Sequence, residues 1–406
     1  MQKFLFVLLC TIGSQILVAQ TSVKPSLIAD TTHITGEETP SSLLIKNKPD
    51  ILENIHMNFL LRSSLEIPDG ETQSRIKMNE ARFEVLGTIV PDLDFRVRWR
   101  INQSHNPKSQ DNSPGSLDIA SVNYKFGKDK KWSINAGKQA AYVGSWEFEN
   151  NPTFEYQYSE FINYQTNIFL MALKLGYQVN KNHSFHLQLH NTYNETFYTT
   201  YGNTGYDFTG VKPAKTPMGL YVSWLGKMFD QKYHTFWSYN VSQFASGKTN
   251  HSFALGNKLV LDKFKAYLDL QYSGLGMDYP NIASPAINAH RLNANPGASR
   301  VFADNINYKS AILRMDYEFV PRWFVTAKGY YEAASQTGNN NVGNNFRENI
   351  GFLAGLEFQP ISSQQMKMFA YYYNNQVKYN NTVSAANTGQ NLNLFSVGVL
   401  YFVNVF

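Results

Sequence analysis

The segment Phe95-Arg96-Val97-Arg98-Trp99-Arg100-Ile101 alternates apolar and basic side chains without a break. Successive side chains of a β-strand point to opposite faces, so this segment is expected to form a strand with one apolar face and one arginine-bearing face. The same alternation recurs in the segments 264–272 and 311–319. Helical periodicity is essentially absent from the rest of the chain, so the sequence predicts an all-β protein.

About sixteen such segments lie between residue 50 and the C-terminus, and each is roughly 9–14 residues long, which is enough to cross a bilayer at a tilt. Strands of soluble sandwiches are nearer 5–6 residues long. The predicted fold class is therefore all-β, a transmembrane antiparallel β-barrel of about 16 strands. The approximate strand centres are Phe59, Phe83, Trp99, Val122, Ala136, Leu173, Leu187, Val222, Trp237, Leu255, Leu268, Leu313, Val325, Phe352, Phe369 and Val399.

Short and long connections alternate along the chain. Short turns are expected near residues 90–94, 127–131, 180–183, 229–232, 261–264, 320–322 and 359–364, and the long links between them are rich in Asn, Gly and Ser. Outer-membrane barrels have short periplasmic turns and longer external loops, so this alternation predicts both topology and orientation. A soluble all-β protein is the alternative, but it has no reason to alternate so regularly.

The composition excludes several classes of protein. The chain has 406 residues with 36 Lys+Arg, 31 Asp+Glu, one Cys, 28 Phe, 25 Tyr and 6 Trp. This aromatic content is incompatible with a disordered chain, and a net charge of +5 without basic runs gives no sign of nucleic-acid binding. A mean hydropathy of −0.35 and the lack of long apolar runs after the N-terminus exclude a helical membrane protein.

The two ends of the chain carry signals for export. Residues 1–19 have a basic start, an apolar stretch and a final small residue, and they predict a signal peptide cut after Ala19, which removes Cys10. Residues 20–50 are rich in Thr, Ser, Pro and Lys and predict a flexible periplasmic leader before a barrel over residues 51–406. The last strand ends in Phe406, which resembles the signal read by the barrel-insertion machinery.

The chain carries no pattern typical of an enzyme. It has no nucleophile elbow, no zinc-binding helix and no paired cysteines, so no catalytic residue, cofactor or metal is predicted. His186 and His190 share a polar strand face, where a solvated lumen wall is favoured over a metal site because no third ligand is placed.

Several runs resemble the phosphate-selective porin O and P family. They lie in the segments 81–98, 118–126 and 134–149, and the clear similarity covers residues 79–177. The resemblance implies a sixteen-stranded, trimeric, general or anion-preferring porin in the outer membrane of a Gram-negative bacterium, in contact with lipid and lipopolysaccharide. Small inorganic or organic anions are the solutes it implies. The rival hypothesis is a non-conducting surface barrel that acts as an adhesin or receptor through its external loops.

Strand parity gives the candidate pore-lining and anion-binding residues: Arg62, Arg82, Arg96, Arg98, Arg100, Lys125, Lys138, Lys174, Arg314 and Lys328, joined by Lys265 and Arg347. The acids expected on the same face are Glu80, Glu84, Asp94, Asp269, Asp316, Glu318 and Glu357. Arg96, Arg98 and Arg100 recur at steps of about 7 Å and could pass an anion along the wall. Alternatively, the arginines pair across strands with Glu80, Glu84 and Asp94 and neutralise the wall.

The link at residues 141–166 is long for a hairpin loop and supplies the candidate constriction residues Trp146, Glu147, Glu149, Glu155, Tyr156, Tyr158 and Glu160. The family resemblance implies that this third external loop folds inward and narrows the lumen. The alternative is an ordinary surface loop.

Overall fold

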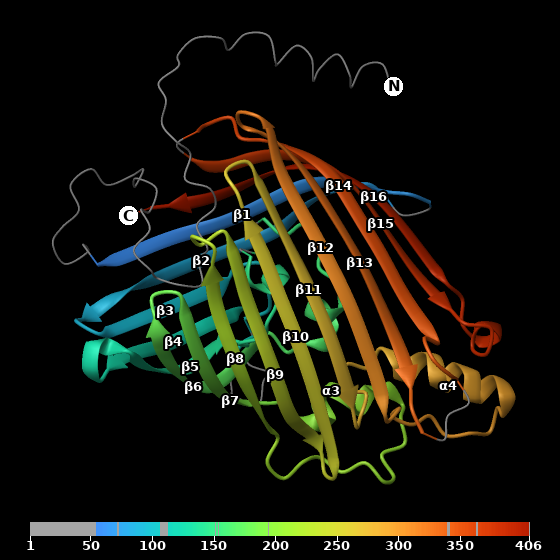
Figure 1. The fold of residues 1–406 in the computed structure, drawn as a ribbon. Helices are drawn as coiled ribbons and strands as arrows, with labels where there is room; N and C mark the ends of the chain where they lie inside the picture. Colours follow the sequence, from blue (N-terminus) through green and yellow to red (C-terminus); the bar gives the residue numbers. More distant parts are fainter. Residues whose placement is uncertain are drawn as a thin grey trace, which may run out of the picture.

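The protein is a closed barrel of sixteen antiparallel strands (Figure 1). The computed structural model describes residues 54–70, 73–105, 113–150, 152, 154–193, 195–338, 342–362 and 364–405. Each strand pairs with its neighbours in the chain, and the first strand pairs with the last from Asn58↔Asn404 to Pro68↔Leu394. Closure leaves no free sheet edge, and in a bilayer a free edge would cost several kcal/mol for each unpaired backbone group. The predicted fold class and strand number are confirmed.

The strands run from 8 to 16 residues, and each contains one of the predicted centres. Their bounds are β1 Ile55–Pro68, β2 Arg75–Val90, β3 Leu93–Arg100, β4 Leu117–Phe126, β5 Trp132–Ala140, β6 Phe169–Asn180, β7 His183–Asn191, β8 Met218–Met228, β9 Tyr233–Ala245, β10 Lys248–Val260, β11 Phe264–Leu275, β12 Ile306–Val320, β13 Trp323–Gln336, β14 Arg347–Phe358, β15 Gln365–Tyr379 and β16 Gln390–Asn404.

Alternation sorts the side chains between the two surfaces of the wall. On β12, Leu313, Met315 and Tyr317 are 42%, 39% and 44% exposed on the outer face, whereas Arg314 between them is 6% exposed and points into the barrel. An apolar outer face next to lipid and a polar inner face are what a membrane barrel requires.

Short and long connections alternate as predicted, except that only residues 246 and 247 join β9 to β10 on the long-loop side. The long connections gather at one end of the barrel, where α3 (Phe197–Tyr201) and α4 (Ala283–Ala294) lie (Figure 1). Two apolar clusters pack these loops together, one around Phe302 and the other around Ile287. The shorter helical pieces are α2 Trp146–Glu149, a π-helical turn Phe161–Gln165 and 3-10 turns Lys128–Lys130, Gly202–Thr204 and Ser384–Ala386.

Within the described ranges, no helix combines the length and the apolar character needed to cross a membrane. The predicted signal peptide, the periplasmic leader and the terminal Phe406 lie outside the described residues.

Candidate functional site

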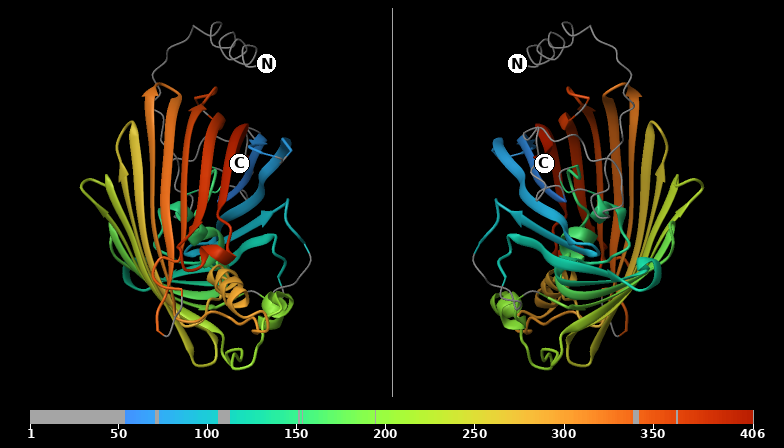
Figure 2. Two further views of the ribbon diagram at one scale, coloured as in Figure 1. Left: turned by 90° about the vertical axis from the view of Figure 1, so that its right-hand side faces the viewer. Right: turned by 90° about the vertical axis from the view of Figure 1, so that its left-hand side faces the viewer.

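The connection between β5 and β6, residues 141–168, lies inside the barrel, and we call it the inner loop (Figure 2). It reaches β13, which is eight positions from β5 in a barrel of sixteen strands and therefore on the opposite wall. The loop thus crosses the whole lumen.

Ion pairs fix the tip of the inner loop to that wall. The Glu155 carboxylate lies 2.7 Å from Lys328 Nζ and 3.0 Å from Arg314 Nη1. Arg62 Nη1 donates to the Glu155 carbonyl at 2.6 Å, and Arg314 Nη1 donates to the Phe154 carbonyl at 2.9 Å. Glu155 is 1% exposed, so these bonds lie in a region from which water is largely excluded.

The charges around Glu155 determine its protonation. Burial alone would raise the pKa of its carboxyl, but Lys328 and Arg314 hold that pKa below its ordinary value. Glu155 is therefore ionised at neutral pH, and the loop tip is held by charge-assisted bonds.

Two wall carboxylates hold the backbone of the inner loop. Asp269 on β11 accepts from the Trp146 and Glu147 backbone N–H groups at 3.0 and 2.9 Å. Glu332 on β13 accepts from the N–H groups of Glu160 and Phe161 at 2.9 and 2.8 Å. Both acids thereby satisfy loop donors that would otherwise be buried without a partner.

The other candidate constriction residues also bond within the lumen. Glu147 pairs with Lys328 at 2.5 Å, Tyr156 donates to Glu357 at 2.8 Å, and Glu160 pairs with Arg347 at 2.6 Å. The Tyr158 ring lies 5.8 Å from Lys328 Nζ. Trp146 packs against Phe236, and Glu149 lines a cavity beneath the loop.

Most of the candidate cations fall into two groups, those that hold the inner loop and those on β2, β3, β4 and β6. Arg62, Arg314 and Lys328 hold the inner loop, and each is 5–6% exposed, so their positive charge is largely matched by loop and wall acids. Lys265, on β11, belongs to neither group and is 9% exposed. The remaining lumen-facing candidates, Arg82, Arg96, Arg98, Arg100, Lys125 and Lys174, lie on β2, β3, β4 and β6.

Four arginines of β2 and β3, together with Glu80, Glu84 and Asp118, form what we call the arginine wall. Asp118 lies 3.3, 3.4 and 2.6 Å from Arg82, Arg98 and Arg100, and it is completely buried. Arg96 pairs with Glu84 at 2.7 Å, and Arg82 pairs with Glu80 at 2.9 Å. Both sequence hypotheses are therefore represented: the arginines stand in a row, and they also pair across strands.

The arginine wall keeps unused hydrogen-bonding capacity. Arg100 Nε is buried without a hydrogen-bond partner in the structure, whereas Arg82 Nη1 and Arg98 Nε lie 3.3 and 3.4 Å from Asp118 Oδ2. Arg98 and Arg100 also lie 5.2 and 5.8 Å from the centre of the Phe169 ring at the start of β6. Buried donors without partners are uncommon and mark a place where water or an anion would bind.

Asp118 pairs with three arginines of the arginine wall, but strand parity in the sequence did not predict that it faces the lumen. By strict alternation Asp118 shares the outward face of Ala120 and Val122. The pairing changes from Arg98↔Ile119 to Trp99↔Leu117, which leaves Asp118 as the extra residue of a β-bulge. A bulge re-aims the side chain of the extra residue, here into the lumen.

Lys138 was predicted to face the lumen, and this prediction is wrong. Lys138 pairs in register with Ala120 and Met171, and Met171 is 40% exposed on the outer face. Paired residues of adjacent strands share a face, so Lys138 points outward. Its Nζ donates to Ser113 at 2.5 Å in the β3–β4 connection.

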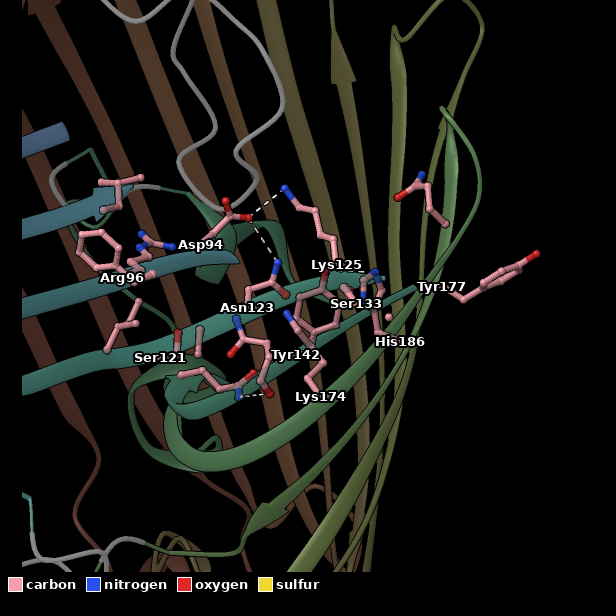
Figure 3. Close-up of a pocket in the computed structure, with 18 of the residues that line it drawn as sticks. Asp94, Arg96, Ser121, Asn123, Lys125, Ser133, Tyr142, Lys174, Tyr177 and His186 are labelled. Carbon is pink, nitrogen blue, oxygen red and sulfur yellow. Dashed lines mark hydrogen bonds and ion pairs between the residues drawn. The ribbon is translucent and has the colours of Figure 1, made fainter. Parts of the chain in front are cut away.

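A cavity of about 320 Å³ lies between the base of the inner loop and the wall of β3–β7 (Figure 3). Its cations include Arg96, Lys125 and Lys174, and its acids are Asp94 and Glu149. Among the described residues, no group of three His, Cys, Asp or Glu side chains could hold a metal ion.

Comparisons with known proteins agree with this geometry. The family model for phosphate-selective porin O and P matches residues 58–401. No curated protein sequence matches the chain significantly.

Solved outer-membrane channels share the fold at low sequence identity. The channel DcaP of Acinetobacter baumannii is 11% identical with a TM-score of 0.59, over 86% of this chain and 96% of that one. An anion-selective porin from Comamonas acidovorans is 10% identical with a TM-score of 0.54, over 86% and 99%. The trimer form of OmpT of Vibrio cholerae is 13% identical with a TM-score of 0.50, over 86% and 98%.

A family match over nearly the whole barrel, and a closed lumen crossed by a loop, lead to one conclusion. The chain belongs to the phosphate-selective porin O and P family and is an outer-membrane diffusion channel of a Gram-negative bacterium.

Proposed function

We propose that the inner loop is the constriction of this channel and that the arginine wall gives the channel a preference for small anions. The observation that carries the proposal is the crossing of the lumen by a loop bonded to the opposite wall through Glu155, Arg314 and Lys328. A solute must pass between this loop and the remaining wall, and the arginine wall borders that passage through Phe169.

Charge on the arginine wall favours anions. Four guanidinium groups, those of Arg82, Arg96, Arg98 and Arg100, face three carboxylates, those of Glu80, Glu84 and Asp118. A surplus of fixed positive charge in a narrow, low-dielectric passage raises the local anion concentration. The Nε atom of Arg100, which has no hydrogen-bond partner in the structure, supplies a donor for an anion that sheds part of its water.

Planar-bilayer recording in a salt gradient tests both parts. We expect open-channel steps and an anion-selective reversal potential. Replacing Arg98 and Arg100 by Gln should shift the potential toward cation selectivity, whereas the matched control Arg322→Gln, in an exposed turn, should not. A cation-selective wild-type channel would rule out the anion preference.

Deletion of residues 150–157 tests the constriction separately. This change removes Glu155 and its bonds, so single-channel conductance should rise. Unchanged conductance with normal assembly would mean that the segment does not limit flow.

The proposal also includes the oligomeric state of the channel and its partners in the outer membrane. A homotrimer is supported by the trimer form of OmpT of Vibrio cholerae, which shares the fold. Outer-membrane lipid, lipopolysaccharide and the barrel-insertion machinery are the further partners we propose, and cross-linking of the purified protein would test the trimer. The family match and the closed barrel also argue for a channel over an enzyme.

The rival function is an adhesin or receptor barrel. The observation in its favour is the packing of the long loops into two apolar clusters at one end of the barrel. A purified protein that inserts into bilayers but gives no open steps would support this function instead.

A further inference from the structure

We propose that the cavity beneath the inner loop is a binding site for a hydroxylated organic anion, that is, a small molecule with one acidic group and several hydroxyls. This inference rests on the proposed channel function and goes beyond it, because it assigns a solute class to a site that shares only Arg96 with the arginine wall. The cavity volume of about 320 Å³ lies at the lower end of the range that holds small organic ligands, about 300–1,000 Å³.

Lys174 and Lys131 are the cations available to the acidic group. Lys125 is held by Asp94 at 2.9 Å, Lys130 by Asp92 at 2.6 Å and Arg96 by Glu84 at 2.7 Å. Lys174 points into the cavity from β6 and forms no ion pair within the described part of the chain (Figure 3). Its Nζ lies 3.8 Å from the centre of the Tyr142 ring, which keeps the ammonium group at the cavity surface.

Neutral polar groups line the rest of the cavity and suit hydroxyls. Ser121, Ser133, Asn123 and Asn135 project into it from β4 and β5. The Asn135 Oδ1 atom is buried and has no hydrogen-bond partner in the structure. An unpaired buried acceptor calls for a donor, and a ligand hydroxyl supplies one whereas a fully ionised acid does not.

Gly176 leaves room for the ligand. It follows Lys174 on the inward-facing row of β6, and a Cβ atom there would lie 2.6 Å from Ser133 Oγ and 2.9 Å from His186 Nδ1. A side chain at this position would displace both polar groups. The Tyr142 ring covers the cavity from the inner loop and offers an apolar surface for carbon atoms of the ligand.

Current block of single channels tests the site with four probes: gluconate, glucose 6-phosphate, inorganic phosphate and glucose. Gluconate and glucose 6-phosphate combine an acid with hydroxyls, phosphate offers mainly charge, and glucose offers only hydroxyls. We expect both organic anions to block the chloride current at lower concentrations than phosphate or glucose. Comparison of the two organic anions distinguishes a carboxylate from a phosphate as the preferred acidic group.

Two variants separate the contributions. Lys174→Gln should raise the half-blocking concentration of gluconate and phosphate about tenfold, because each loses a bond to a charged donor. Asn135→Ala should raise that of gluconate about fivefold and that of phosphate less, because phosphate has fewer hydroxyl donors than gluconate. Lys309→Gln, on an exposed outward position of β12, is the matched control and should change neither.

The inference would be overturned if phosphate blocked the current at as low a concentration as gluconate and Asn135→Ala had no effect on block by gluconate. The anion preference would still stand in that case. A wild-type channel that fails to conduct or selects cations would instead refute the proposed function. In that case calorimetric titration of the detergent-solubilised protein with gluconate decides the inference independently. Binding that is weakened by both variants supports it, and no binding overturns it.

Discussion

Lys328 on β13 and Glu155 on the inner loop form an ion pair of 2.7 Å although 173 residues separate them in the chain. The pair joins a loop rooted on β5 and β6 to the opposite wall of the barrel. Tyr267 on β11 donates to the same carboxylate at 3.1 Å, so three strands of that wall, β11, β12 and β13, converge on one loop residue.

Glu155→Gln should loosen the inner loop. The variant keeps the size of the side chain but leaves Lys328 and Arg314 without their shared charge, and removing one partner of a buried ion pair costs about 3–5 kcal/mol. We expect a larger and noisier single-channel conductance. Asp262→Asn, in an exposed turn, is the control. An unaltered conductance would mean that the backbone bonds to Asp269 and Glu332 hold the loop by themselves.

Acidification should release the same contact. Burial opposes ionisation of Glu155, but Lys328 and Arg314 bring its folded-state pKa below the ordinary 4.5. The contact therefore stabilises the loop above pH 4.5 and is lost as the pH falls through the lower folded-state pKa. Conductance should therefore rise as the pH falls below about 4.5. In Glu155→Gln channels this acid-induced rise should disappear. An equal rise in the variant would assign it to another group.

Asp118→Asn should increase anion selectivity. The carboxylate balances Arg82, Arg98 and Arg100, so its neutralisation leaves three guanidinium groups with less counter-charge. The variant should lower the unfolding free energy by about 3–5 kcal/mol and shift the reversal potential toward the anion limit. Urea unfolding and salt-gradient recording measure the two effects. A shift toward cations would contradict the role assigned to Asp118.

Arginine on the outer face should destabilise the barrel. Val97 and Met315 are 38% and 39% exposed on that face, and Val97→Arg or Met315→Arg at mid-membrane should cost about 2–4 kcal/mol. The matched controls Val97→Ile and Met315→Leu keep the surface apolar and should unfold as the wild type does. The readout is loss of heat-resistant assembly in gel electrophoresis, and full tolerance of both arginines would place these positions away from lipid.

Much of the barrel could be predicted because the sequence patterns that indicate its strands and connections lie within short segments. Period-two alternation in segments such as 95–101 and 311–319 determined which residues form strands and which face each presents, and the alternation of turn and loop lengths gave the order of the connections. Lys138 shares the parity of Trp132 and Ile134, so its outward position was also readable from the sequence, although the prediction assigned it to the lumen.

Asp118 shows where the local rule fails. A single bulge reverses the face of one residue, and its position depends on how β3 and β4 align, which neither strand encodes alone. Parity therefore found the arginines of the arginine wall but missed the carboxylate that pairs with three of them.

The sequence by itself determined a membrane barrel with more basic than acidic side chains on its lumen face and a long third loop, because strand periodicity and loop length are properties of short segments. Only the tertiary structure decided which cations remain available to a solute. Arg314 and Lys328 are bound by Glu155 because barrel closure brings β12 and β13 opposite β5, whereas Lys174 projects into a cavity. Pairing of charges across a lumen depends on distances that arise only when all sixteen strands are joined.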